Sequence, residues 1–103
     1  MYILVLSTCG SRKEAEKIAL DLLDRRLVAC VNVMPIRSFY RWKGKVRVDR
    51  EYLILAKTRS KFFAELKKRI LAIHSYELPE IVWFRIEGGH GKYLDWIGAE
   101  VGG

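Results

Sequence analysis

The chain starts with a short apolar run, which is followed by an apolar stripe at helical spacing. Residues 2–8 are almost all apolar and include β-branched side chains, which is typical of a strand buried on both faces. After Cys9-Gly10, apolar residues recur every three or four positions, and Ser11 with Glu14 matches a capping box at a helix start. The pattern predicts a central strand and then a helix over residues 11–26.

A very long hairpin is predicted over residues 28–58. Strand-like alternation runs through both halves, and Lys43-Gly44-Lys45 supplies the turn, because glycine accepts the positive φ that tight hairpins require. Pro35 demands a bulge or an edge position. Residues 52–56 are apolar on both alternating faces, so helices on one side of the sheet would leave an apolar face in water. We therefore expect neighbouring copies of the chain to cover that face.

The rest of the chain predicts a second helix, a fourth strand and a short C-terminal helix. Ser60 is placed to cap the second helix. The apolar stripe of this helix comprises Phe62, Leu66, Ile70 and Ile73. Residues 80–87 are typical of a strand and residues 88–91 of a loop, and the last helical stripe comprises Tyr93, Trp96 and Ile97. The order β-α-β-β-α-β predicts one α+β domain over residues 1–103, a ferredoxin-like antiparallel sheet with both main helices on one face.

Composition fits a single folded domain of 103 residues, half of which are hydrophobic. No apolar run approaches the ~20 residues of a membrane span, and no export signal precedes the first strand. We therefore expect a soluble cytoplasmic protein with no membrane partner, in which Cys9 and Cys30 stay reduced. The absence of Gln, the single Asn and the abundance of Lys, Arg and Glu predict a thermostable protein.

The net charge of +7 is concentrated at the predicted hairpin turn. Six of the 19 basic residues fall between residues 37 and 50, where Asp49 is the only acid. With Phe39, Tyr40 and Trp42, these residues suggest a surface on which nucleic-acid bases stack. Aromatic cross-strand pairs and basic edge residues are also ordinary features of a solvated hairpin, and no strand carries the RNA-recognition motif. A nucleic-acid partner is therefore the less favoured interpretation.

Candidate chemistry is sparse along the chain. The sequence has no P-loop, HExxH motif, catalytic triad or paired carboxylates, so we expect a protein that is not an enzyme, and acylphosphatase-like hydrolysis on the same fold is the least favoured alternative. The loop before the first helix has two interpretations: its free N–H groups bind an anion, or Ser11 only caps the helix. Cys9, at a strand end beside a helix start, is a better thiolate candidate than Cys30, which suits an apolar strand. His74 either joins a polar or metal site with Tyr76 and Glu80 or is a hydrogen-bonded structural residue.

Several motifs follow one another along nearly the whole chain. They are Ala29-Cys30-Val31-Asn32, Pro35, Ser38-x-Tyr40-x-Trp42-x-Gly44, Glu51, Lys57-Thr58, His74-x-Tyr76-x-x-Pro79-Glu80-Ile81 and Tyr93-Leu94-Asp95-Trp96. Together they resemble the CutA family of divalent-cation tolerance proteins. The resemblance implies a homotrimer that is similar in architecture to the PII signalling proteins, and a connection with divalent metal ions, copper in particular.

The resemblance also implies candidate ligand positions. The copper-binding pattern of the family matches Ser7, Ile73 and His74 here, and Cys9 stands two residues from Ser7 on the same strand face, so His74 and Cys9 are the candidate metal ligands. Recurring polar residues of the family predict a ligand pocket between subunits, formed by Cys30, Glu51, Lys57, Tyr76 and Glu80. The implied function is a trimeric, non-enzymatic response to divalent metal ions, with copper(II) or another divalent cation bound. The alternative is a PII-like sensor of a nucleotide or metabolite at the subunit clefts.

Overall fold

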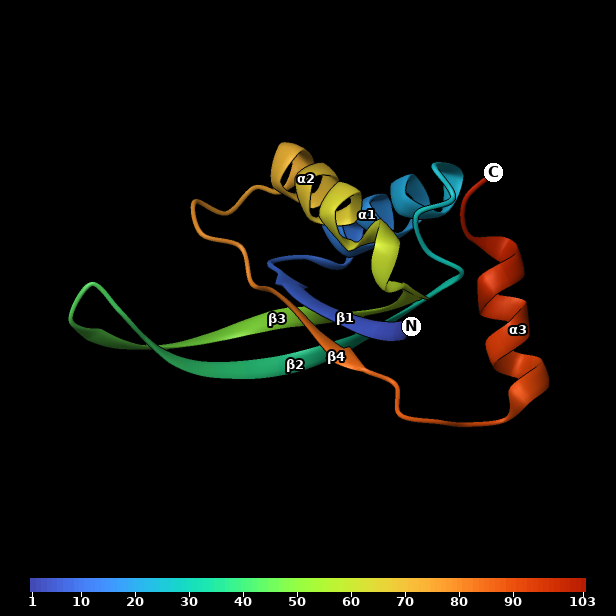
Figure 1. Cartoon of the computed structure of the whole chain (residues 1–103). Helices are drawn as coiled ribbons and strands as arrows, with labels where there is room; N and C mark the ends of the chain where they lie inside the picture. Colours follow the sequence, from blue (N-terminus) through green and yellow to red (C-terminus); the bar gives the residue numbers. More distant parts are fainter.

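The computed structural model describes all 103 residues and confirms the ferredoxin-like prediction. The elements are β1 (Tyr2–Cys9), α1 (Arg12–Asp24), β2 (Cys30–Trp42), β3 (Lys45–Arg59), a short 3₁₀ helix (Ser60–Phe62), α2 (Phe63–Ile73), β4 (Ile81–Arg85) and α3 (Gly91–Glu100). The four strands form one antiparallel sheet in the order β2-β3-β1-β4. Helices α1 and α2 lie together on one face of the sheet, and α3 stands at the end that holds the N-terminus (Figure 1).

Helix α1 ends at Asp24, two residues earlier than the sequence pattern predicts. Arg26 adopts a positive φ of 55°, and two hydrogen bonds close the helix end: Leu27 N–H donates to the Leu22 carbonyl and Arg26 N–H to the Leu23 carbonyl, each at 3.0 Å. This is a Schellman motif, which turns the chain out of the helix and satisfies carbonyls that the last turn would leave free. The motif was missed because it usually carries glycine at the position that Arg26 occupies here.

The prediction that Ser60 caps the second helix is wrong. Residues Ser60–Phe62 form a 3₁₀ turn, and α2 begins at Phe63 without a side-chain cap. The Ser60 N–H instead donates to the carbonyl of Met1 at 2.8 Å. Ser60 therefore prolongs the pairing of β3 with β1, and its backbone belongs to the sheet. The fourth strand is also shorter than predicted and spans Ile81–Arg85.

The hydrophobic core lies between the sheet and the helices α1 and α2. Its largest fully buried side chains are Ile3, Val5, Ile18, Leu22, Ile54, Leu66 and Ile70. One polar group in this layer is satisfied locally, because Thr58 Oγ1 donates to the carbonyl of Leu27 at 2.7 Å. Along β1, at least every second side chain lies in this core, as expected for a strand with one face covered by helices.

The opposite, helix-free face of the sheet is also apolar. We define it by the side chains that share it in register: Leu4, Leu6, Met34, Leu53, Leu55, Val82 and Phe84. None of them is fully buried, and Phe84 is 56% exposed. The structure thus confirms that the sheet is apolar on both faces, whereas only one face is covered by α1 and α2.

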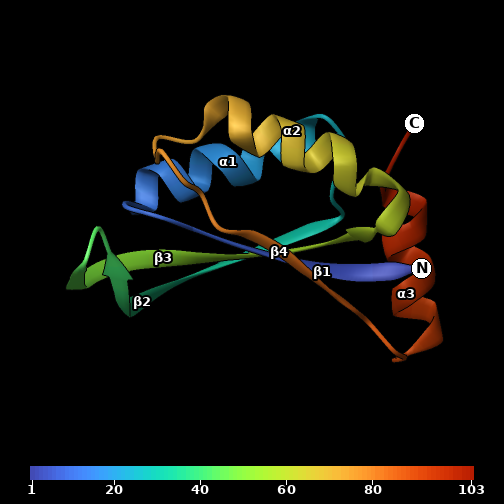
Figure 2. The ribbon, with the colours of Figure 1, turned by 60° about the vertical axis from the view of Figure 1, so that its left-hand side comes forward.

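The β2-β3 hairpin extends well past the two helices as an arm (Figure 1), and Figure 2 shows this arm turned toward the viewer. Its register is uninterrupted from the pair Cys30–Lys57 to the pair Trp42–Lys45. Lys43 and Gly44 form the predicted turn with φ values of 50° and 79°, the two positive angles that a two-residue hairpin turn requires. Pro35 sits in an unbulged strand, which is tolerated because β2 is the edge of the sheet. No helix of the protein is long and apolar enough to cross a membrane.

Candidate functional site

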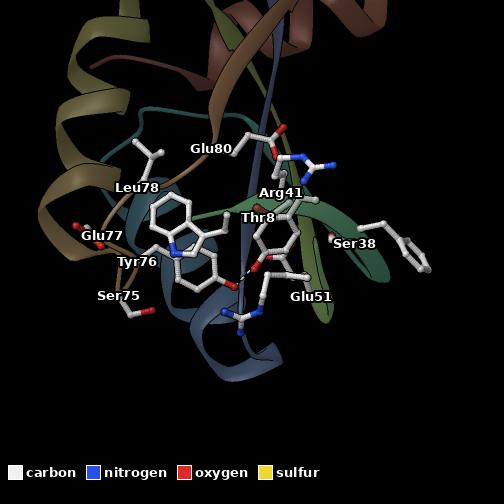
Figure 3. Close-up of a pocket in the computed structure, with 13 residues that line it drawn as sticks. Thr8, Ser38, Arg41, Glu51, Ser75, Tyr76, Glu77, Leu78 and Glu80 are labelled. Carbon is white, nitrogen blue, oxygen red and sulfur yellow. Dashed lines mark hydrogen bonds between the residues drawn. The ribbon is translucent and has the colours of Figure 1, made fainter. Parts of the chain in front are cut away.

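A cavity of about 750 Å³ opens where the hairpin arm leaves the sheet. The segment that follows α2 crosses beside the end of β1 and brings Tyr76 against β3. There the Tyr76 hydroxyl donates to Glu51 Oε2 at 2.7 Å (Figure 3). Glu51 is only 7% exposed, so its carboxylate is a buried charged group with a specific partner. We call this space the tyrosine cavity.

The tyrosine cavity combines aromatic faces with charges of both signs. Its aromatic lining includes Tyr40, Trp42 and Tyr76; its charged lining consists of Arg41, Arg47, Glu51, Glu77 and Glu80. Small-molecule sites typically join apolar walls to a few placed polar groups, and this lining has that character. The arrangement suits a ligand that offers a flat apolar part and an anionic group for the arginines.

Protonation in and beside the tyrosine cavity is set by burial. Burial, and next the hydrogen bond to Glu51, raises the pKa of Tyr76 well above its ordinary value, so the phenol is a neutral donor at physiological pH. Burial also raises the pKa of the Cys9 thiol, whose Sγ donates to the Ser11 carbonyl at 3.4 Å. Burial thus works against a Cys9 thiolate, and the choice of Cys9 over Cys30 as the thiolate candidate stays a prediction.

The side chain of His74 is fully buried and uses both ring nitrogens within the chain. Its Nε2 lies 2.7 Å from the Thr8 carbonyl, and its Nδ1 lies 3.0 Å from the Tyr76 backbone nitrogen. A carbonyl only accepts and an N–H only donates, so the ring donates from Nε2 and accepts at Nδ1, which is the neutral tautomer. This geometry favours the interpretation of His74 as a hydrogen-bonded structural residue that positions Tyr76.

The copper positions implied by the family do not form a ligand set in this chain. Ser7 is buried, and its hydroxyl has no hydrogen-bond partner; Ile73 offers no donor atom, and the nitrogens of His74 are both engaged. The structure contains no group of three or more His, Cys, Asp and Glu side chains that could hold a metal ion. The residues present therefore do not fit a copper cage at this position.

Glu14 ties the site to the first helix. Its N–H donates to Ser11 Oγ at 3.1 Å, which confirms half of the predicted capping box. Its carboxylate instead accepts from the N–H and the hydroxyl of Ser75, each at 2.9 Å. Burial alone would raise the pKa of Glu14, but the hydrogen bonds from Ser75 and from the Gly10 N–H hold that pKa below its ordinary value. The segment that carries Tyr76 is thereby fastened to the start of α1.

The predicted pocket residues fall into two clusters within one chain. Glu51, Tyr76 and Glu80 line the tyrosine cavity. Lys57 lies six residues from Glu51 along β3, roughly 20 Å away at strand spacing, and Cys30 is paired opposite it. This second cluster has its own contacts, since Lys57 Nζ donates to Asn32 Oδ1 at 3.3 Å and to the Tyr93 hydroxyl at 3.2 Å.

Sequence reasoning assigned the hairpin aromatics to ordinary strand packing and so missed several members of the site. The missed lining residues are Thr8, Ser38, Phe39, Tyr40, Arg41, Trp42, Arg47, Ser75, Glu77 and Leu78. A usable signal was present in the register that the Lys43-Gly44 turn fixes. Counting back from that turn places Tyr40, Arg47 and Glu51 on one face of the arm.

Comparison with known proteins gives a consistent result. A family model described as CutA1 divalent ion tolerance protein matches residues 3–100. The curated "Divalent-cation tolerance protein CutA" of Thermus thermophilus is 45% identical over 103 residues, covering 99% of this chain and 100% of the relative. The protein of the same name from Archaeoglobus fulgidus is 44% identical over 97 residues, covering 94% of this chain and 95% of the relative.

Solved structures agree with the sequence relatives. The structure described as a divalent cation tolerance protein (Cut A1) from Thermus thermophilus superposes with a TM-score of 0.96 at 45% identity, covering 99% of this chain and 100% of that one. The CutA1 structure from Oryza sativa gives a TM-score of 0.94 at 36% identity, with coverages of 97% and 93%. The structure of the Archaeoglobus fulgidus protein, described as periplasmic, gives 0.92 at 44% identity, with coverages of 94% and 95%.

Proposed function

We propose a function that starts from the family, since the chain belongs to the CutA1 family of divalent ion tolerance proteins. In this proposal the protein supports tolerance of divalent cations as a non-enzymatic homotrimer, and it binds a small ligand in the tyrosine cavity. One observation carries this proposal: Glu51 is a buried carboxylate that is held by Tyr76 inside a cavity with aromatic walls. A buried carboxylate is costly unless it is paired or hydrogen-bonded, and Glu51 has only the Tyr76 hydroxyl as its side-chain partner while it lines a space of ligand size.

The chemistry of the lining supports a nucleotide or a metabolite as the ligand, as in the PII-like alternative. Arg41 and Arg47 offer planar, permanently charged donors for a phosphate or carboxylate. Tyr40 and Trp42 offer aromatic faces on which a flat ring stacks. The function proposed is recognition of such a ligand, without a chemical step.

A thermal-shift screen of nucleotides, carboxylates and divalent cations tests this proposal. A ligand at about one hundred times its Kd stabilises the native state by roughly 2.7 kcal/mol. We expect this shift for the wild-type protein and its loss in Glu51→Gln, which keeps the side-chain shape. Glu65→Gln, the same change at an exposed position of α2, should keep the shift. Equal shifts in both variants, or no shift with any compound, would contradict the proposal.

The homotrimer is supported by the helix-free face of the sheet. Seven large apolar side chains share that face, and a monomer would expose them to water. Closed cyclic assemblies bury such faces without leaving a free interface at either end. Light scattering at micromolar concentration should give three times the mass of 12.0 kDa, and a stable, folded monomer would refute this part of the proposal.

Copper(II) is the second candidate ligand. It comes from the predicted ligands His74 and Cys9, and the His74 ring contacts the backbone carbonyl of Thr8, the residue before Cys9. Binding would require both side chains to exchange their present hydrogen bonds for the metal. Copper titration of the wild type, His74→Ala and Cys9→Ala tests this site. Loss of the same bound copper ion in both variants would support His74 and Cys9 as ligands, whereas identical copper binding by all three proteins would exclude them.

Two further expectations concern the protein as a whole. A cytoplasmic location is tested by fractionating cells that express the chain with its natural ends. Thermostability, which the low amide content supports, is tested by calorimetric melting. A midpoint in the ordinary mesophilic range of about 45–65 °C would contradict it.

A further inference from the structure

A second cavity, of about 640 Å³, lies between the start of α1 and the base of the hairpin arm. Three arginines from three different elements line it: Arg12 from α1, Arg37 from β2 and Arg50 from β3. It meets the tyrosine cavity only at Glu51 and is otherwise lined by different residues. We call it the arginine cavity.

Arg37 and Arg50 face each other directly across the hairpin. Directly opposed residues of an antiparallel pair have their Cβ atoms about 5 Å apart, and like charges in that position destabilise the sheet. No carboxylate lies within ion-pair distance of either guanidinium, and the Arg37 guanidinium lies over the ring of Phe39, 5.6 Å from its centroid. The register therefore places two uncompensated positive charges side by side.

The surroundings do not supply the missing negative charge. Arg12 reaches only Glu16 on its own helix, at 4.0 Å, and both of those side chains are largely exposed. Glu51 is the only carboxylate that lines the cavity, and it accepts a hydrogen bond from Tyr76. Three guanidinium groups thus converge on a space in which the only anionic group is already engaged.

We propose that the arginine cavity binds a small anion that carries a diphosphate group. Each guanidinium presents several N–H donors in a fixed fork and pairs best with two oxygens at once. A carboxylate offers two oxygens and a single phosphate at most four, whereas a diphosphate offers enough acceptors for three forks. The size of the cavity accommodates such a group together with what it is attached to.

This inference goes beyond the proposed function, because it concerns a second site that shares only Glu51 with the tyrosine cavity. The free diphosphate anion and a nucleoside diphosphate present the same group to the arginines. Pyrophosphate and ADP are therefore the two probes, titrated calorimetrically into the wild-type protein at low ionic strength. Binding of ADP without binding of pyrophosphate would identify the ligand as a nucleoside diphosphate. Equal affinity for the two probes would show that the cavity recognises the diphosphate group alone.

The decisive variant is Arg37→Gln with Arg50→Gln, and its matched control is Lys67→Gln with Lys68→Gln on the exposed side of α2. Both double variants remove the same net charge. We expect the arginine variant to weaken binding of the probe at least about tenfold, because two charge-assisted contacts are lost. The lysine variant should change the affinity less than about twofold, since neither lysine lines the cavity and both are exposed and screened.

Stability without a probe separates binding from a structural role. Removing two opposed like charges should leave the melting temperature of the arginine variant unchanged or higher. A lower melting temperature would show that the arginines hold the hairpin, and it would overturn the proposal. Two other outcomes overturn it as well: saturable binding of neither probe, or equal weakening by both double variants.

Discussion

The hydrogen bond between Tyr76 and Glu51 makes the substitution Tyr76→Phe a sharp test of the site. The change removes one hydroxyl that donates to a carboxylate with 7% exposure, and it leaves the ring in place. A hydrogen bond to a charged group contributes about 1.5–3 kcal/mol. Because Tyr76 itself is 36% exposed, water can partly replace the lost donor, and we expect a loss of about 1–2 kcal/mol in the free energy of unfolding.

Denaturant unfolding at a fixed protein concentration measures this loss, and Tyr40→Phe is the control. Tyr40 also donates to a carboxylate, that of Asp49, but this pair lies exposed on the hairpin arm. The same chemical change there should leave the free energy of unfolding essentially unchanged. For a chain of this length, 1 kcal/mol corresponds to roughly 4–8 °C in Tm, so the two variants are readily distinguished. Equal losses would refute the conclusion that burial of Glu51 gives the bond its strength.

The pH dependence of stability provides an independent readout of the same bond. The pKa of Tyr76 is raised in the folded protein, mainly by burial, so the native state keeps a proton that the unfolded chain releases above its ordinary pKa of about 10. The contribution of this group to stability is therefore complete below pH ~10 and is lost as the pH rises further. The Tyr76→Phe variant should lack this alkaline loss; an identical alkaline profile would contradict the assignment.

Three further predictions follow from other contacts. Burial would raise the pKa of Glu14, but its hydrogen bonds to Ser75 lower that pKa in the folded protein. The free energy of unfolding of the wild type should therefore fall as the pH drops below about 4.5. Glu14→Gln should reduce this loss at acid pH, as measured by denaturant titrations. Thr58→Val leaves the Leu27 carbonyl buried without its donor and should cost about 1–2 kcal/mol by the same assay, whereas no loss would deny the bond a role. Leu55→Glu places a charge on the helix-free face and should lower the mass of the proposed trimer in light scattering, whereas an unchanged trimeric mass would count against this face as the interface.

Most of the fold could be predicted from local patterns. The two-sided apolarity of β1 and β3, the helical stripes and the Lys43-Gly44 turn each act over a few residues, and together they determine the order of the elements. The errors occur at helix ends. A left-handed Arg26 and a Ser60 that is drawn into the sheet by Met1 both depend on neighbours that the local sequence does not show.

The site could be predicted only in part. The bond between Glu51 and Tyr76 joins residues that are 25 positions apart, and it requires the crossing segment after α2 to pass the end of β1. No periodicity specifies that path. The motif resemblance grouped Cys30 and Lys57 with Glu51, whereas strand spacing along β3 keeps them roughly 20 Å apart in one chain. A shared pattern of residues identifies what a family retains, and it does not identify which of those residues touch.

Ser7 carries a consequence for how this protein can change over time. Its hydroxyl is buried without a partner, which costs about 1–3 kcal/mol, so replacement by alanine would make the fold more stable. Replacement by cysteine would set a second thiol two residues from Cys9 on the same face of β1. One substitution thus leads toward greater stability, and another leads toward a pair of soft ligands. Position 7 is thus one point in the core where stability alone would favour a residue without a hydroxyl.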